Sequence, residues 1–138
     1  MLSKATGYAI QMLTWLAKRY DVKESNKLYF VHQIAESLSI PQNFLSKIAV
    51  ILSKKKIISA QKGPKGGICL AKHPEKITLY DIAQIFDDDI TKNKCLIGKP
   101  TCSDNTNCPI HKFWKHERLK LIEQLKDINI MDLAKQSD

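Results

Sequence analysis

The segment that most constrains the fold is VHQIAESLSIPQNFLSKIAVILSKKK, residues 31–56, where a proline interrupts a long stretch of helical sequence. Apolar residues recur every three or four positions on both sides of Pro41, which predicts two amphipathic helices over residues 31–38 and 42–55. Proline cannot continue the first helix, but it is tolerated at the start of the second. Two short helices joined by the tight turn at residues 39–41 make a helix-turn-helix.

A glycine-rich turn follows the two helices. GPKGG, residues 63–67, lies between two short apolar runs, which predicts a β-hairpin with strands over residues 57–61 and 68–71. After a helix-turn-helix, such a hairpin is expected to act as a wing; a plain hairpin with solvated lysines is the alternative. Lys62, Lys65 and Gly66 lie near its tip, where a wing meets the phosphate backbone or a minor groove.

The remaining chain is also mainly helical. Helices are predicted over residues 4–19, with Ser3 as N-cap, over residues 77–86, with Thr78 as N-cap, and within the tail, residues 129–138. Residues 28–30 are predicted as a short strand. The expected fold class is therefore mainly α with a small β-wing. Apolar runs fall well short of the roughly 20 residues of a membrane helix, and the N-terminus does not resemble a signal peptide, so we expect a cytoplasmic protein without a membrane partner.

Positive charge is concentrated in the helix-turn-helix and the wing. The formal net charge is +8, and residues 41–76 carry eight lysines against one acidic residue, Glu75. Such a basic segment on a small domain indicates a polyanionic partner, usually nucleic acid, although a solvated surface would also carry it. The lysines are Lys47, Lys54, Lys55, Lys56, Lys62, Lys65, Lys72 and Lys76.

The second helix of a helix-turn-helix enters the major groove of double-stranded DNA, and its N-terminal residues reach the base edges. Here those residues are Gln42, Asn43, Ser46 and Lys47. Asparagine and glutamine can pair with adenine, and lysine with the acceptors of guanine. The predicted DNA-contacting set also includes Ser3, Lys4 and Tyr8 from the first helix, and Lys62, Lys65 and Gly66 from the wing.

Three cysteines and a histidine lie in one polar loop, CLIGKPTCSDNTNCPIH, residues 95–111. Their spacing, Cys95-x6-Cys102-x5-Cys108-x2-His111, is neither helical nor that of a strand, so core packing is not the expected role. Thiolate and imidazole groups ligate both zinc and iron–sulfur clusters. Zinc knuckles usually contain a tight Cys-x2-Cys pair, which this chain lacks. The wider spacing favours an iron–sulfur cluster, with zinc or thiol redox chemistry as alternatives.

The last two of these residues have a defined place in the predicted structure. Pro109 suits the first position of a helix that continues through HKFWKHERLKLIEQLKD, which puts Cys108 at its N-cap and His111 in its first turn. The positive end of this helix would then face the thiolate charge of a bound cluster. A neutral histidine ligand would raise the reduction potential relative to four thiolates and would make ligation pH-sensitive.

The long helix also predicts how the chain assembles. Its apolar face is expected to form a homodimer, and a two-fold dimer would match a palindromic DNA operator. Packing of this face within one chain is the alternative. The face comprises Trp114, Leu121, Leu125 and Ile128, joined by Phe113 and Ile122. The chain is thus divided into a winged helix-turn-helix DNA-binding domain (1–90), a cysteine-rich cluster-binding loop (91–111), and a dimerisation helix with a C-terminal tail (109–138).

The chain resembles the bacterial winged-helix regulators that include the iron–sulfur regulator IscR, the nitric-oxide sensor NsrR and the cysteine-metabolism regulator CymR. The resemblance covers nearly the whole chain. It rests on LSKATGYAIQMLTWLA at the start, IAESLSIPQNFLSKIAVIL in the helix-turn-helix, KGPKGGICLAKHPEKITLYDI across the wing, and the cysteine loop. The wing pattern GPKGG-x2-LA is the most specific of these.

The resemblance implies a homodimer that binds DNA through its winged helix and, as in several members, holds an iron–sulfur cluster in the loop. Cys95, Cys102, Cys108 and His111 match the IscR-like ligand set, which implies a 2Fe–2S cluster. The first gap is one residue longer here than in the IscR pattern. The nitric-oxide sensor takes a ligand from the partner's first helix near the position of Tyr8, where tyrosine is a poor match. Members like CymR lack the cysteine loop.

These observations predict a transcriptional regulator that senses iron–sulfur status, redox state or nitric oxide. The alternative is a winged-helix regulator with a structural zinc or a thiol-based redox switch in the loop. A small redox enzyme or electron carrier is not expected, because no pattern resembles a substrate pocket and the basic winged helix would be unexplained. Cys69 lies outside the loop and is predicted to be a half-buried strand residue.

Overall fold

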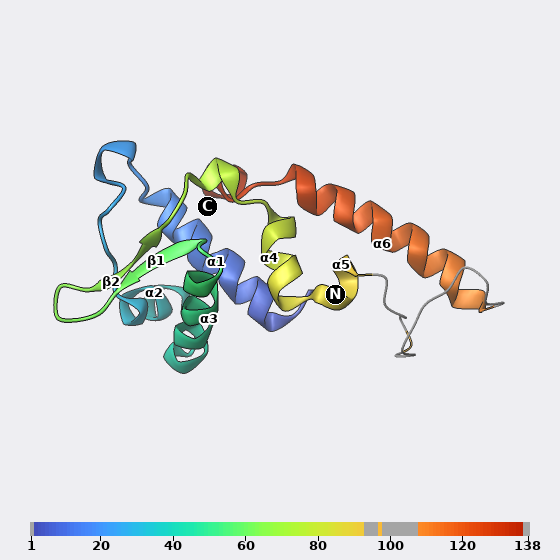
Figure 1. Ribbon diagram of the computed structural model, residues 1–138, viewed down its shortest axis with the longest axis horizontal. Helices are drawn as coiled ribbons and strands as arrows, with labels where there is room; N and C mark the ends of the chain where they lie inside the picture. Colours follow the sequence, from blue (N-terminus) through green and yellow to red (C-terminus); the bar gives the residue numbers. More distant parts are fainter. Residues whose placement is uncertain (1, 93–96, 98–107, 137–138) are drawn as a thin grey trace.

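The computed structural model describes residues 2–92, 97 and 108–136, and it shows a mainly helical protein with one small antiparallel sheet (Figure 1). The predicted fold class is confirmed. No helix in these described ranges is long and apolar enough to cross a membrane. The elements are α1 (Lys4–Lys18), η1 (Val22–Glu24), α2 (Val31–Leu38), α3 (Gln42–Lys54), β1 (Ile58–Gln61), β2 (Gly67–Leu70), η2 (Pro74–Lys76), α4 (Leu79–Phe86), α5 (Asp88–Thr91), α6 (Pro109–Asp127) and α7 (Ile130–Ala134).

The helix-turn-helix is present at its predicted place. α2 ends at Leu38, its C-cap Ser39 turns the chain with a left-handed φ of 55°, and Pro41 immediately precedes α3. The Ile40 amide donates to the Ala35 carbonyl at 3.0 Å, and the Leu45 amide donates to the Pro41 carbonyl at 3.2 Å. These two bonds close the turn from both sides. The apolar residues of α2 and α3 then pack with α1 in one core.

The predicted wing is the antiparallel pair of β1 and β2, in which Ile58 pairs with Leu70. The strand predicted at residues 28–30 is wrong, because the pairing there is limited to an isolated bridge between Tyr29 and Ile68. Reciprocal backbone hydrogen bonds of 3.0 and 2.8 Å join these two residues. Gly67 permits the close approach: its φ is +135°, and an added Cβ would lie 2.6 Å from the Tyr29 carbonyl oxygen.

The last helix closes the core of the winged helix. Thr78 and Asn129 form an antiparallel bridge, and each begins a helix with a capping box, α4 and α7 respectively. The Ile130 amide donates to the Ile77 carbonyl at 2.8 Å, and both isoleucine side chains are fully buried. α7 packs against α1. It therefore shares one core with the N-terminal half of the chain, although it follows α6 in sequence.

The long helix α6 begins at Pro109 with Cys108 as its N-cap, as predicted, but its buried side matches the predicted apolar face only in Trp114, Ile122 and Leu125. α6 packs on α4 and on α5, which is too short to give a periodic signal in the sequence. The Arg118 guanidinium donates to the Ile90 carbonyl at 3.4 Å in this contact. Phe113, predicted on the apolar face, is 58% exposed, and Leu119 is 50% exposed. The buried residues of α6 are His111, Trp114, Arg118, Ile122 and Leu125.

We predict that Gly67→Ala lowers the free energy of unfolding by about 2–4 kcal/mol, because the added Cβ meets the Tyr29 backbone from a left-handed conformation. Gly7→Ala is the matched control. A Cβ on Gly7 meets nothing within 4 Å, and alanine is the better helix former, so stability should rise by about 0.5–1 kcal/mol. Urea denaturation measures both changes. Unchanged stability of Gly67→Ala would contradict the close approach of the wing to Tyr29.

Candidate nucleic-acid interface

The first turns of α3 present polar side chains at the surface. Gln42, Asn43 and Lys47 are exposed and Ser46 is half-buried, whereas Leu45 is fully buried and anchors the helix in the core. One side of α3 therefore packs while the other offers hydrogen-bonding groups to a partner. The structure brings these four predicted residues together on one short segment.

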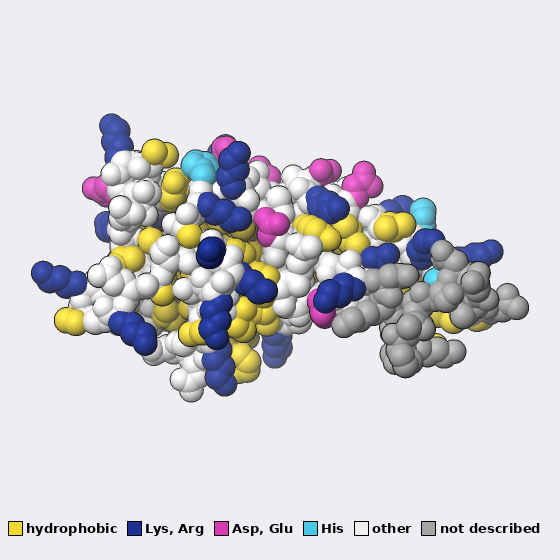
Figure 2. Space-filling model, in the orientation of Figure 1, with side chains coloured by type: hydrophobic (Ala, Val, Ile, Leu, Met, Phe, Trp, Pro, Cys, Tyr) yellow, Lys and Arg dark blue, Asp and Glu magenta, His cyan; other side chains and the backbone are white. Residues whose placement is uncertain are grey.

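Lysines surround α3 and the wing. On the face shown in Figure 2, lysine and arginine side chains gather over α3 and the wing with few acidic side chains among them, whereas basic and acidic side chains are mixed along α6. This distribution gives the helix-turn-helix and wing a positive surface suited to a phosphate backbone. The exposed lysines of this surface are Lys47, Lys54, Lys55, Lys56, Lys62 and Lys65.

Gly66 shapes the tip of the wing. It is buried, its amide donates to the Gly63 carbonyl at 2.9 Å, and an added Cβ would lie 2.1 Å from the Gln61 carbonyl oxygen. The turn consequently has no room for a side chain at this position. Lys62 and Lys65 remain exposed on the same turn. The structure thus gives Gly66 a conformational role, and its predicted contact with DNA stays a prediction.

The start of α1 carries the remaining predicted DNA contacts. Lys4 is exposed, and the half-buried ring of Tyr8 lies edge-on to that of Phe44 on α3, with 6.2 Å between the centroids. Ser3 also makes contacts within the protein, since its Oγ accepts a hydrogen bond from the Thr6 amide at 3.3 Å as the cap of α1, and its predicted contact with DNA stays a prediction. Tyr8 therefore lies beside α3, the helix predicted to contact the base edges of DNA. Ser3 has a structural role at the start of α1.

A buried carboxylate, which the sequence does not single out, holds the start of α1. Asp87, 7% exposed between α4 and α5, accepts hydrogen bonds at 3.0 Å from the Ser3 amide and from the Ser3 hydroxyl. The fully buried Thr6 hydroxyl also donates to it. Several donors make the burial of a carboxylate tolerable. The sequence has a run of three aspartates, residues 87–89, and no local signal shows which of them turns inward.

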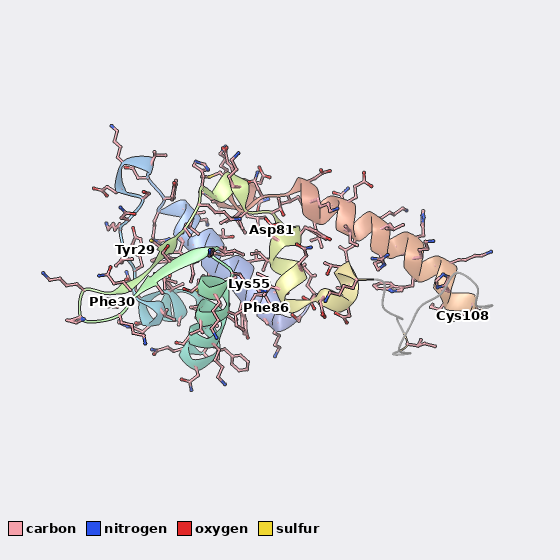
Figure 3. All side chains as sticks on the ribbon, in the orientation of Figure 1. Tyr29, Phe30, Lys55, Asp81, Phe86 and Cys108 are labelled. Carbon is pink, nitrogen blue, oxygen red and sulfur yellow. The ribbon has the colours of Figure 1, made fainter. Side chains whose placement is uncertain are left out.

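Two of the four predicted cluster ligands are described, and they lie three residues apart at the start of α6. Cys108 is the half-buried N-cap of α6, and His111, 5% exposed, donates its backbone amide to the Cys108 carbonyl at 3.2 Å. Figure 3 shows Cys108 at the outer end of α6, far from the wing. Cys95 and Cys102 lie outside the described residues. Within the described part of the chain, no group of three or more His, Cys, Asp or Glu side chains could hold a metal ion.

Cys69 lies in β2 and is 8% exposed, so the predicted strand placement is confirmed and the side chain is more buried than expected. Burial raises the pKa of the Cys69 thiol because it disfavours the thiolate. A protonated thiol is a poor nucleophile and a poor metal ligand. Cys69 therefore lies apart from the predicted ligand set of the loop.

Comparison with known proteins identifies relatives of this chain. The model of the Rrf2 family, described as iron-dependent transcriptional regulators, matches residues 2–136. A helix-turn-helix-type transcriptional regulator of Aquifex aeolicus is 34% identical over 135 residues, which cover 96% of this chain and 90% of the relative. The regulator NsrR of Shouchella clausii is 31% identical over 139 residues, covering 99% and 90%. The structure of CymR, the global cysteine regulator of B. subtilis, matches with a TM-score of 0.80 at 20% identity, covering 100% of this chain and 98% of that one.

A winged helix with an exposed polar helix and two exposed lysines at the wing tip is typical of DNA-binding transcriptional regulators. Within this class, the chain belongs to the Rrf2 family. The resemblance to NsrR, IscR and CymR that the sequence predicts is thereby confirmed. Because the relatives are transcriptional regulators, the expectation that the chain is not an enzyme is confirmed as well.

We predict that Asp87→Ala lowers the free energy of unfolding by about 1–3 kcal/mol, because the buried Thr6 hydroxyl loses its acceptor. The control is Asp89→Ala, in α5 two residues further along the chain. Asp89 is exposed, so the free energy of unfolding should change by no more than about 0.5 kcal/mol. Thermal or urea denaturation compares the two variants. Equal stabilities would show that the contacts of Asp87 with α1 do not stabilise the fold.

Proposed function

We propose that the chain is a homodimeric regulator that binds double-stranded DNA through α3 and the wing and senses iron–sulfur, redox or nitric-oxide status. Sensing is assigned to a cluster held by Cys95, Cys102, Cys108 and His111. The observation that carries the proposal is that the helix bearing Cys108 and His111 packs on the same α4–α5 corner that holds the start of α1.

In this proposal, α3 enters the major groove and the wing contacts the backbone or the minor groove. The exposure of the α3 side chains and the positive charge around them support this assignment. Lys62 and Lys65 would neutralise phosphates at the wing tip. The residues assigned to base edges are Gln42, Asn43, Ser46 and Lys47.

Dimerisation is proposed through the exposed sides of α6. Phe113 and Leu119 are both large, apolar and exposed, and helical geometry turns them away from the buried side of α6. Their burial against a second copy would remove apolar surface from water. A two-fold dimer would present two α3 helices to the two halves of a palindromic operator.

The donor set fits an iron–sulfur cluster of the 2Fe–2S type. Three thiolates and one imidazole suit such a centre, and the backbone N–H groups at the start of α6 favour negative charge beside Cys108. The likeness to NsrR and the iron-dependent description of the family support iron as the metal. When bound, the cluster would supply a centre that responds to electrons or to nitric oxide.

A continuous set of packed contacts could carry a change at the ligands to the DNA-binding surface. α6 packs on α4 and α5, where the Arg118 guanidinium donates to the Ile90 carbonyl at 3.4 Å. Asp87, in the same corner, binds Ser3 at the start of α1. Tyr8 of α1 in turn contacts Phe44 on α3. A change in ligation at the start of α6 would therefore shift the position of α3 in each copy of the proposed dimer.

A second candidate function follows from the same donor set, because Cys3His also binds structural zinc. The chain would then be a DNA-binding regulator with a structural zinc or a thiol-based switch in the loop. Both functions place the protein with the bacterial chromosome in the cytoplasm, where thiols stay reduced. Metal analysis separates the two, since zinc would be present without acid-labile sulfide.

We predict that Lys65→Ala weakens binding to all DNA sequences by about three- to tenfold. The plot of the logarithm of the association constant against the logarithm of the salt concentration should also become shallower, its negative slope decreasing in magnitude by about one. The reason is the loss of one phosphate contact at the wing tip. Lys23→Ala is the matched control, because Lys23 is an exposed lysine of η1, away from α3. Titrations at several salt concentrations measure both effects. Equal behaviour of the two variants would remove the wing tip from the DNA interface.

We predict that anaerobically purified protein is coloured and contains iron and sulfide, and that Cys102→Ala abolishes the colour while leaving a folded dimer. Cys69→Ala is the control and should keep the colour, because Cys69 lies in β2 outside the ligand set. Visible absorption, iron and sulfide assays and size-exclusion chromatography measure these properties. A coloured Cys102→Ala protein would refute the ligand assignment, and a colourless wild-type protein containing zinc would favour the second candidate function.

A further inference from the structure

A groove runs between α3 and the wing, beside the residues proposed to contact DNA. Its volume is about 570 Å³, and it is open to solvent. Apolar side chains form most of its floor: Phe30 before α2, Ala49 and Val50 on α3, and Ala60 and Ile68 on the wing. The walls of the groove are therefore the same two elements that a winged helix uses on DNA.

One face of α3 is directed at this groove. Ser46, Ala49, Val50, Ser53 and Lys54 line it, and their spacing of three and four residues places them on one side of the helix. Ser46, nearest the start of α3, is already a proposed base contact. The groove therefore continues the proposed DNA surface along the length of the helix.

The apolar floor is exposed at its centre. Val50 is 54% exposed, and Phe30, which Figure 3 shows beside the wing, is 39% exposed. The interior residues around them, Ala49 and Ile68, are 5% and 3% exposed. Val50 is thus a large apolar side chain on α3 that lies outside the hydrophobic core. An exposed apolar surface of this kind is commonly a binding site.

Positive charge flanks the floor on both sides. Lys54 lies on the α3 wall and Lys62 on the wing wall, and both are exposed. The hydroxyl groups of Ser46 and Ser53 and the amide of Gln61 add hydrogen-bonding groups along the groove. A ligand that fits must therefore carry negative charge on both edges and apolar groups between them. Along one strand of duplex DNA, successive phosphates are separated by deoxyribose carbons, and thymine methyl groups lie beside them in the major groove, so two phosphates could meet Lys54 and Lys62 with apolar carbon between them.

We propose that the groove seats one strand of the bound duplex and that Val50 packs against an apolar edge of that strand. This edge is either a thymine 5-methyl group or the carbons of a deoxyribose. The inference rests on the proposed DNA binding and adds a contact residue to it. An acidic protein partner is the less favoured occupant, because the groove is continuous with the α3 residues and the wing lysine proposed for DNA.

The test measures the affinity of Val50→Ala for a duplex that the wild-type protein selects from a random-sequence library. Binding should weaken by about four- to tenfold, since one or two methyl contacts are lost. Val50→Asp should weaken binding more than tenfold, because a carboxylate would face the phosphates. The loss of affinity relative to the wild-type protein should be largest at low salt, where this repulsion is least screened. Val22, 70% exposed on η1, provides the matched controls Val22→Ala and Val22→Asp, and neither should change affinity by more than about twofold.

A second duplex, with deoxyuridine in place of thymidine, distinguishes the two apolar edges. If the loss caused by Val50→Ala disappears on this duplex, Val50 contacts a thymine methyl group; if the loss persists, Val50 contacts deoxyribose. Wild-type affinity of both Val50 variants on both duplexes would overturn the proposal while leaving the proposed function intact. If the wild-type protein binds no duplex, the proposed function fails and the inference fails with it. Circular dichroism of each variant confirms that the fold is retained.

Discussion

The burial of α1 is the constraint on which the other parts depend. Met12 and Leu13 are fully buried, and α1 packs against α3, α4 and α7. Trp15 joins it to two further segments, because its Nε1 donates to the Ser37 hydroxyl at 3.0 Å and its ring lies edge-on to Tyr29, 5.1 Å between centroids. Tyr29 in turn pairs with the wing. The position of α1 therefore fixes both the helix-turn-helix and the wing, which must be held in one geometry to meet a duplex.

α3 divides its residues between the core and the solvent in a way that suits recognition. Leu45 and Leu52 are fully buried, so the helix cannot rotate about its axis without exposing them. The outer surface is free to carry lysines, amides and the exposed Val50 because those positions do not contribute to packing. Stability and the proposed DNA binding are thus assigned to different faces of one helix.

α6 shows why an apolar pattern does not by itself identify an interface. The sequence predicts one face that includes Phe113 and Trp114, whereas the structure buries Trp114 with Arg118 and leaves Phe113 exposed. Two neighbouring elements, α4 and α5, decide which side is covered. One nitrogen of the Arg118 guanidinium donates to the Ile90 carbonyl at 3.4 Å in this contact. The exposed apolar residues of α6 consequently remain available to a second copy of the chain.

The sequence by itself determined the features that depend on neighbouring residues. Pro41 and the apolar spacing around it specified the helix-turn-helix, the glycines of residues 63–67 specified the wing, and Thr78 and Pro109 marked the starts of α4 and α6. The lysine-rich segment likewise pointed to a polyanionic partner before any fold was known. Each of these signals is local, because turn geometry, capping and amphipathic spacing act over a few residues.

Tertiary structure decided the features that depend on residues far apart in the chain. The pairing of Asp87 with Ser3, the return of α7 to the core beside α1 and the covered side of α6 have no local sequence pattern. The groove at Val50 likewise exists because α3 and the wing pack at a fixed distance. These contacts form when elements that are distant in sequence bury their apolar surfaces against one another. The spacing of residues within one segment does not specify which elements pack together.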